Sequence, residues 1–251
     1  MASWSRQRRL KYAATIIAVL VVAAGVPAFF FFYKAPSCSD GIKNGDEQGV
    51  DCGGSCEKLC PVAFLAPSVS WARFKEVAPG LYNMAAYVIN PNRNAEATGT
   101  PYQMSLLNDQ GIPLAEIDDV MTIPPGRDTL VFQGAVSAGK QTPARTFFQF
   151  TAPPRWFVRS DPLSSLSVSD KNYNETASSS SLFVAISNSS VNPVKDVIIY
   201  AVLLDKDGNV LDFSKTAVDL IPPSGTAHAP FTWPISHGGA VVSIEVLLMA
   251  K

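Results

Sequence analysis

Two hydrophobic patterns divide the chain. Residues 12–33 form an apolar run that no charged side chain interrupts, whereas the chain after residue 61 shows short stretches in which apolar and polar positions alternate. A helix over these 22 residues would span roughly 33 Å, close to the ~30 Å hydrocarbon core of a bilayer. The alternation is typical of half-buried β-strands. The chain is therefore predicted to have one transmembrane helix followed by an all-β body.

The strand pattern is clearest at residues 182–187 and 242–248, where Val, Ile and Leu occupy every second position. Residues 114–121 have a three-residue apolar period that also fits a helical turn. Their counterpart at 211–215 alternates, so both segments are predicted to be strands.

The β body contains an internal repeat. Asn90 and Asn188 end similar stretches that lie 98 positions apart, and Gly111 and Gly208 end similar turns that lie 97 apart. In the turns glycine supplies a positive φ, and the Pro-Pro pairs mark loops because proline cannot lie in a central strand. One unit of roughly 95 residues therefore occurs twice, and several short strands per unit predict an antiparallel sandwich. The matching blocks are 82–90 with 180–188, 102–111 with 199–208, 123–126 with 221–225, and Phe132 with Phe231.

Charge around the apolar run sets its expected orientation. Four basic residues precede the run and a single Lys34 follows it, so the positive-inside rule places the N-terminus in the cytoplasm. A cleaved signal peptide is the alternative, with Val26-Pro27-Ala28 as the cleavage site. The run continues through Phe29–Phe32, which favours an uncleaved anchor. Under both interpretations residues 35–251 lie outside the cytoplasm, and the lipid bilayer is a partner through residues 12–33.

All four cysteines fall in one short, glycine-rich segment, at Cys38, Cys52, Cys56 and Cys60. Such a segment cannot form a hydrophobic core and needs covalent or metal cross-links. Two disulfides suit an exported protein, and three pairings are open. Zinc is the alternative, but the spacing lacks the two-residue knuckles of common zinc sites.

Oxygen-bearing side chains crowd the same segment, which makes it a candidate calcium site. The alternative is that Asp-Gly and Asn-Gly pairs simply make tight turns with solvated acids. The candidate ligands are Asp40, Asn44, Asp46, Glu47 and Asp51.

Residues Asp40–Cys56 resemble a short cysteine module, Asp-Gly-Ile-x-Asn-Gly-Asp-Glu-x-Gly-Val-Asp-Cys-Gly-Gly-x-Cys, found in many secreted and surface-displayed bacterial proteins. The match covers about a tenth of the chain. The resemblance implies export and names no activity.

The β body resembles the FxLYD-type and late-embryogenesis-abundant-type immunoglobulin-like domains. The resemblance rests on Val184–Asn188, Val202–Gly208 and Leu220–Gly225, while the first unit departs from the pattern at Asn108–Gly111. It implies a non-enzymatic sandwich of the kind found on anchored or exported proteins. The expected fold class is mainly β, with two tandem immunoglobulin-like antiparallel β-sandwiches preceded by one transmembrane helix and a small disulfide-rich module.

Composition offers little chemistry. Twenty basic residues balance 21 acidic ones, so no basic field predicts a nucleic-acid partner. The two histidines, His228 and His237, are interpreted as structural, and Asp118-Asp119 as a solvated pair on opposite strand faces. Six aromatic residues could stack on sugars, but core packing is the favoured interpretation. They are Trp71, Trp156, Trp233, Phe147, Phe148 and Phe150.

The predicted organisation is a basic cytoplasmic tail at 1–11, a transmembrane helix at 12–33, a cysteine-rich module at 35–61, and sandwiches at 62–152 and 153–251. The expected function is that of a membrane-anchored, extracytoplasmic structural or interaction protein of the cell envelope, without enzymatic activity and with an unknown protein or glycan partner. The alternative is an accessory subunit of a secretion, pilus or envelope-assembly machine. A hydrolase is the third hypothesis, and it requires a pocket that unites a histidine with a carboxylate and a nucleophile.

Overall fold

The computed structural model describes residues 3–32, 37–58, 60 and 64–250. The chain divides into two compact units, Met1–Cys56 and Glu57–Lys251. Tyr33 and Lys34, the first residues of the predicted cysteine-rich module, and the predicted start of the first sandwich lie outside the described residues.

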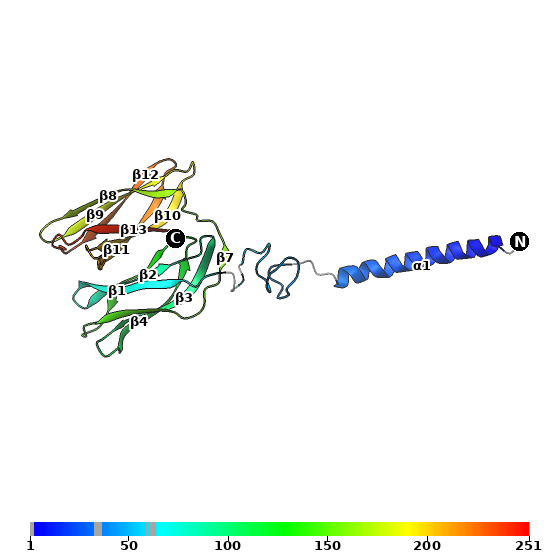
Figure 1. The fold of residues 1–251 in the computed structure, drawn as a ribbon, viewed down its shortest axis with the longest axis horizontal. Helices are drawn as coiled ribbons and strands as arrows, with labels where there is room; N and C mark the ends of the chain where they lie inside the picture. The colour runs from blue at the N-terminus through cyan, green and yellow to red at the C-terminus, as the bar shows by residue number, and fades with distance from the viewer. Residues whose placement is uncertain (1–2, 33–36, 59, 61–63, 251) are drawn as a thin grey trace. The chain divides into compact units, whose positions relative to one another are not determined.

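One long helix, α1 (Ser3–Phe32), contains the apolar run (Figure 1). Its segment Arg9–Pro27 is long and apolar enough to cross a membrane, and none of it is buried in protein. A signal sequence near an N-terminus meets the same criterion. Pro27 lies inside the helix.

The second unit is built from antiparallel strands, as the alternation predicts. The two segments with ambiguous periodicity, 114–121 and 211–215, both lie in strands. The strands are β1 (Ser68–Ala78), β2 (Leu81–Ile89), β3 (Ala95–Leu107), β4 (Pro113–Ile123), β5 (Thr129–Ser137), β6 (Arg145–Phe150), β7 (Phe157–Val158), β8 (Leu166–Glu175), β9 (Ser180–Asn188), β10 (Val194–Leu204), β11 (Val210–Ile221), β12 (Thr226–Trp233) and β13 (Ser243–Ala250).

The two halves of this unit share one strand order. Within the described chain the strands form four sheets, ordered β1-β2-β5, β4-β3-β6 with β7 on β3, β12-β9-β8, and β11-β10-β13. Each strand of the first half from β1 to β6 therefore has a counterpart in β8 to β13. The predicted turns are also in place, since the amide of Gly111 donates to Asn108 O and that of Gly208 donates to Asp205 O. The mainly β fold of antiparallel sheets is thus confirmed.

Each half encloses its own hydrophobic core. Met84, Met104 and Leu106 are fully buried between the sheets of the first half. Leu182, Ile186 and Ile199 are fully buried between those of the second half. The alternation at 242–248 follows the second core, because Ile244, Val246 and Leu248 pack on it while Leu247 faces away.

A third apolar cluster joins the two sandwiches. Ala85, Tyr87 and Leu130 from β2 and β5 pack with Val202 and Phe213 from β10 and β11. The Phe213 ring lies 6.1 Å from that of Trp71 and 6.2 Å from that of Phe132. Figure 1 shows the two groups of strands side by side, with β11 next to β1. The sandwiches are therefore docked through an apolar face, and the sheets β1-β2-β5 and β11-β10-β13 lie inside the stack.

The first sandwich continues past the predicted division between residues 152 and 153. β7 pairs with β3, and Trp156 is buried in a small cluster with Ala97 and Ile123. The bulk of the Trp156 side chain, just after the Pro-Pro join, keeps this segment on the first sandwich.

Candidate functional site

The cysteine-rich segment is cross-linked by disulfides. Cys38 and Cys56 form one bond, with Cα atoms 5.6 Å apart. Cys52 and Cys60 are disulfide-bonded as well, and no cysteine among the described residues is free. The predicted disulfide bonding is confirmed, and with the sulfur atoms so engaged no thiolates remain there for zinc.

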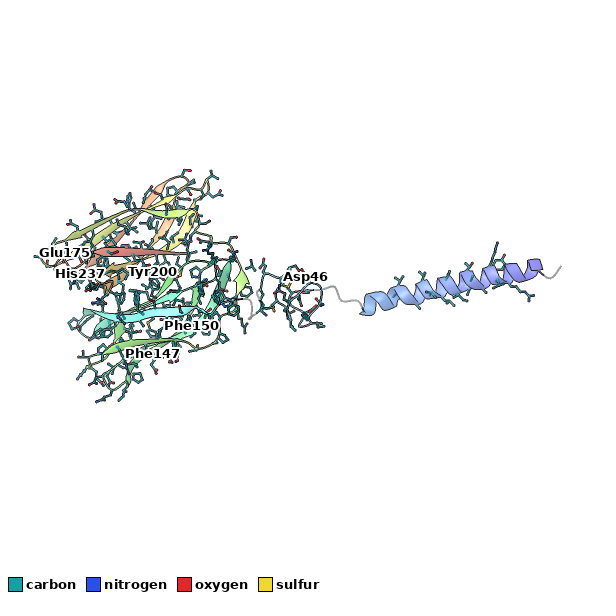
Figure 2. The ribbon with its side chains drawn as sticks, viewed as in Figure 1. Asp46, Phe147, Phe150, Glu175, Tyr200 and His237 are labelled. Carbon is teal, nitrogen blue, oxygen red and sulfur yellow. A yellow bond between two sulfur atoms is a disulfide. The ribbon has the colours of Figure 1, made fainter. Side chains whose placement is uncertain are left out.

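The five candidate calcium ligands fall into two groups. Asp40 and Asp51 organise the first turn, where Asp51 accepts the Gly41 amide at 3.0 Å and Asp40 accepts the side-chain amide of Asn44 at 2.8 Å. Asn44, Asp46 and Glu47 instead line one small cavity beside the Cys38–Cys56 disulfide. Figure 2 labels Asp46 in this segment. The sequence analysis treated all five residues as one candidate site. In the fold, Asp40 and Asp51 shape the loop, whereas the other three residues line the hollow.

A histidine does meet a carboxylate and a hydroxyl in the second sandwich. His237, in the loop between β12 and β13, places Nε2 3.3 Å from Asp212 Oδ2 and Nδ1 3.0 Å from Ser180 Oγ. The Tyr173 hydroxyl lies 3.1 Å from the same Nδ1. Figure 2 shows His237 beside Glu175, whose Oε2 accepts from Tyr173 and whose Oε1 accepts from Ser236.

Burial and a competing acceptor make this group a packing network. Ser180 is 3% exposed and Asp212 5%, and the His237 side chain is 6% exposed. The Ser180 hydroxyl lies 3.1 Å from Ile235 O, an acceptor that competes with His237 Nδ1 for its single proton. A nucleophile needs its proton directed to the base and an open approach for substrate. Burial is the main cause that raises the pKa of Asp212, opposed by its bonds to the Phe213 amide and His237.

His228 and the acid pair are surface features. His228 is exposed on β12. Asp118 and Asp119 are exposed on β4 and bond different partners, since Asp118 accepts from Gln103 and Asp119 from Gln133. The exposure of both residues agrees with the prediction, and Asp119 in addition lines the cavity where the two sandwiches meet.

The aromatic residues serve mainly the hydrophobic interior. Trp156, Trp233 and Phe148 are buried, and Trp71 lies in the contact between the sandwiches. Phe147 and Phe150, labelled in Figure 2, both lie on β6. Of the six aromatic residues considered for sugar stacking, only Phe147 is largely exposed. No flat aromatic platform for sugars exists among these six described residues.

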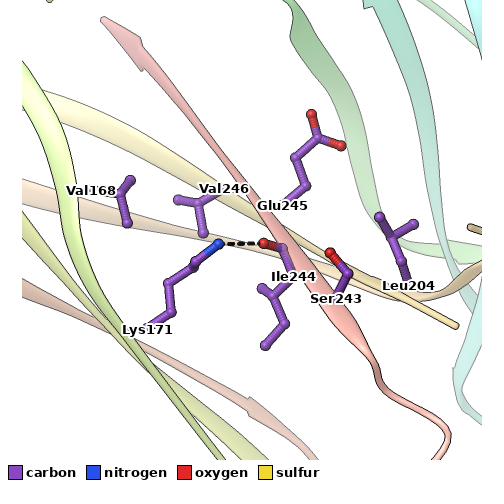
Figure 3. A pocket seen from close by; sticks show the side chains of 7 residues that line it. All are labelled: Val168, Lys171, Leu204, Ser243, Ile244, Glu245 and Val246. Atoms are coloured by element: carbon purple, nitrogen blue, oxygen red, sulfur yellow. Dashed lines mark hydrogen bonds between the residues drawn. The ribbon is translucent and has the colours of Figure 1, made fainter. Parts of the chain in front are cut away.

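Two hollows follow the outer edge of β13. The larger, of about 470 Å³, lies between β8 and β13 and is shown in Figure 3. Lys171 spans it, and its Nζ donates to the backbone carbonyl of Ile244 at 2.7 Å. The smaller, of about 170 Å³, lies between residues 245–248 of β13 and the first sandwich. There the Tyr87 hydroxyl donates to the Glu245 carboxylate at 2.6 Å. Glu245 and Val246 line both hollows.

β13 is an edge strand. Within the described chain it pairs only with β10, so one side of its backbone faces the two hollows. Lys171 covers part of that edge, which is a common way to protect an edge strand from unwanted pairing. Sequence reasoning did not single out Lys171. The isolated lysine in the β8 pattern is a signal only once the strand order is known.

A further cavity of about 300 Å³ lies where the two sandwiches meet. Tyr102, Asp119 and Gln133 bond one another along its wall, and Lys215 projects over the Phe132 ring at 5.6 Å. Burial is the largest of the effects that raise the pKa of Tyr102 to about 12, so its hydroxyl stays protonated at neutral pH.

Comparison with known proteins yields little. No family model matches the chain, and no curated protein matches it. Among solved structures, the chain is similar to one assigned as a beta-galactosidase from Bacteroides fragilis, at 10% identity and a TM-score of 0.21, covering 74% of this chain and 41% of that one. It is also similar to a beta-glucuronidase of glycoside hydrolase family 2, at 10% identity and a TM-score of 0.21, covering 87% of this chain and 29% of that one. The chain thus spans less than half of either structure, and likeness at this level carries no argument about function.

Proposed function

We propose that this chain is a single-pass membrane protein with a cytoplasmic N-terminus, whose extracytoplasmic part is a non-enzymatic interaction module of the cell envelope. Its partner is another envelope protein that binds through an extended segment at the outer edge of β13. The observation that carries the proposal is this open edge, flanked by two hollows, on a body whose histidine–carboxylate–hydroxyl group is buried.

Three features support the location. The apolar segment of α1 has the length of a membrane span, and basic residues precede it in the sequence. The disulfide-bonded cysteines suit an oxidising compartment. The resemblance of Asp40–Cys56 to modules of exported proteins points the same way.

The edge of β13 suits an added strand. A peptide aligned beside it would use the backbone groups of β13 that do not pair with β10, and would displace Lys171 from the Ile244 carbonyl. Its alternate side chains would enter the two hollows. Lys171 is the cation at the rim, and it now donates to a neutral carbonyl. Arg127, in contrast, is paired with Asp161. Charge complementarity therefore favours a segment with an acidic side chain opposite Lys171.

Docking of the sandwiches makes the edge suitable for recognition. The hollows take residues from β2, β8 and β13. The apolar contact around Phe213 holds β2 and β13 together, and Val168 of β8 packs on the second core together with Val246 of β13. A preformed surface avoids the entropic cost of ordering it upon binding.

Site-specific photo-crosslinking in intact cells of the native source tests the proposal. A photoreactive residue replaces Val242, which is 68% exposed next to β13, or Val191, which is 83% exposed in the loop between β9 and β10, as the control. We expect a discrete product with a second protein from position 242, its loss with Lys171→Glu, and no such product from position 191. Equal labelling at both positions, or none at position 242, would contradict an interaction role at this edge.

Purification in mild detergent then separates the two kinds of interaction. A crosslinked partner that co-purifies in a stable multi-subunit complex would assign the chain to an envelope-assembly or secretion machine. A partner that stays with the chain only because of the crosslink would indicate that the chain is displayed by itself and binds its partner transiently.

A test of location uses the cysteines. In intact cells we expect a thiol reagent to label the chain only after a reductant is added. Labelling without reductant would contradict export, because it would show free thiols.

A further inference from the structure

The cysteine-rich segment forms a small hollow of about 40 Å³ that is partly open to solvent. Its polar walls are the side chains of Asn44, Asp46, Glu47 and Ser55, and the Cys38–Cys56 disulfide closes one side. The hollow is large enough for one ion or one water molecule, since a water needs at least about 10–15 Å³ of such space.

Two oxygen atoms on this wall lack hydrogen-bond donors. Asn44 Oδ1 is buried and has no hydrogen-bond partner among the described residues. Glu47 is only 9% exposed, and its Oε2 accepts a hydrogen bond from the backbone amide of Asn44 at 3.1 Å. The contact of its Oε1 is Cys56 Sγ at 3.5 Å, and a disulfide sulfur has no hydrogen to donate.

Leaving such atoms buried without a partner is costly. A buried polar group that lacks a partner destabilises a fold by about 1–3 kcal/mol, and a charged one by more. Two unsatisfied oxygen atoms beside one small hollow suit a positively charged group that would complete the coordination of both.

Asp46 adds a second carboxylate. Its Oδ1 accepts the Ser55 hydroxyl at 2.7 Å, and the residue lines the same hollow as Asn44 and Glu47. The cavity thus combines two carboxylate groups with an amide carbonyl.

We propose that this cavity binds one calcium ion through Asn44, Asp46 and Glu47. Oxygen donors favour a hard cation over zinc, and the only sulfur atoms nearby among the described residues are locked in a disulfide. Calcium tolerates irregular coordination that water completes, whereas magnesium demands a near-ideal octahedron. With only two carboxylates, the affinity belongs in the range of extracellular modules, about 10⁻⁴ to 10⁻³ M.

The test uses the full chain in detergent and calcium chloride as the probe, with binding followed by isothermal titration calorimetry. We expect one site per chain and a Kd of about 10⁻⁴ to 10⁻³ M. Glu47→Gln should weaken binding by at least about tenfold, because it removes a charged ligand.

Asp51→Asn is the matched control. It removes an acid from the same segment that does not line the cavity. A diffuse acidic surface would lose affinity equally in both variants, whereas the proposed site should be affected mainly by Glu47→Gln.

Disulfide integrity separates a lost ligand from a misfolded segment. Both variants should retain all four cysteines in disulfides, measured by mass after thiol alkylation without reductant. If Glu47→Gln exposes thiols, Asn44→Ala serves as the second variant, since it removes the unpartnered amide oxygen without changing charge. The proposal is overturned if the parent chain binds no calcium at about 10 mM, well above this range, or if Asp51→Asn weakens binding as much as Glu47→Gln.

Discussion

Asn90 and Asn188 hold the same pair of loops together in the two sandwiches. Asn90 Nδ2 donates to Pro124 O at 2.6 Å and to Ala95 O at 3.0 Å. Asn188 Nδ2 donates to Pro222 O at 3.2 Å and to Asn192 O at 2.8 Å. In each sandwich a buried amide thereby ties the Pro-Pro loop to the loop that follows the strand ending in Asn.

We therefore expect Asn90→Ala and Asn188→Ala each to lower the free energy of unfolding by about 2–4 kcal/mol. Each substitution leaves two carbonyls and one backbone amide of the loops without their partner. Urea unfolding of the detergent-solubilised chain measures the loss. Asn172→Ala, on the exposed side of β8, is the control and should change stability by less than about 0.5 kcal/mol. Equal effects at positions 172 and 188 would show that these bonds contribute little.

Ser224 occupies a backbone position that glycine holds in the first sandwich. The amide of Gly126 donates to Asn92 O and that of Ser224 to Ser190 O, and both residues have positive φ, 61° and 47°. Because a side chain strains this conformation, Ser224→Gly should stabilise the chain by about 1 kcal/mol.

The reverse change, Gly126→Ser, should destabilise by more than that. A Cβ at position 126 would lie 2.9 Å from the carbonyl oxygen of Arg93, in addition to the strain of its φ. Thermal unfolding of both variants and the parent measures the two changes in melting temperature, an increase for Ser224→Gly and a decrease for Gly126→Ser. A drop in melting temperature for Ser224→Gly would contradict the equivalence of the two turns.

Phe213 couples the two sandwiches, so Phe213→Ala should loosen the first sandwich although the substitution lies in the second. The side chain is 1% exposed, and its truncation should cost about 3–5 kcal/mol. Hydrogen exchange should quicken in β2 and β5, because these strands pack on Phe213 through Ala85, Leu130 and Phe132.

Leu182→Ala is the matched variant, since Leu182 is fully buried in the core of the second sandwich and lies outside the contact with the first. It should quicken exchange in β8, β9 and β12 and leave β2 and β5 close to the parent. If neither substitution changes the hydrogen exchange rate in β2 and β5, the two sandwiches are independent.

The repeat offsets in the sequence placed the strands well. Asn90 directly follows β2 and Asn188 ends β9, because the side chain of each Asn ties the end of its strand to the Pro-Pro loop. Alternation also placed the inward face of β13, since its period of two is a property of the strand itself.

The docking of the sandwiches was not predicted, although the chain carries a signal for it. Residues 197–203 of β10 are apolar at every position, which is typical of a strand buried on both faces. A single sandwich buries one face of each sheet, so this run indicates a second covering layer.

The His237 network could not be read from the sequence. Asp212 lies 25 positions away and Ser180 lies 57 away, in no recognisable motif. Their meeting depends on how β9, β11 and the loop after β12 pack, which is a property of the whole sandwich. The same holds for Lys171 and Ile244, which are 73 positions apart.

The pH dependence of stability provides a test of the buried Asp212. Burial raises the pKa of its carboxyl in the folded chain above the ordinary value of 3.8. Between these two values the folded state binds more protons than the unfolded state, so this group's contribution to stability is complete at low pH and is lost as the pH rises through the folded pKa. Asp212→Asn removes that loss. Its single oxygen can still accept the backbone amide of Phe213 in place of Oδ1, while its NH2 group faces His237 Nε2 in place of Oδ2.

The free energy of unfolding of Asp212→Asn, relative to the parent, should therefore increase as the pH rises from about 3.5, with a slope of at most about 1.4 kcal/mol per pH unit. Urea unfolding at closely spaced pH values gives this difference. Asp207→Asn, in the exposed turn before β11, is measured in the same way as the control for removing one carboxyl. A difference that decreases with pH for Asp212→Asn would mean that the attraction to His237 outweighs burial, and that the folded pKa lies below the ordinary value.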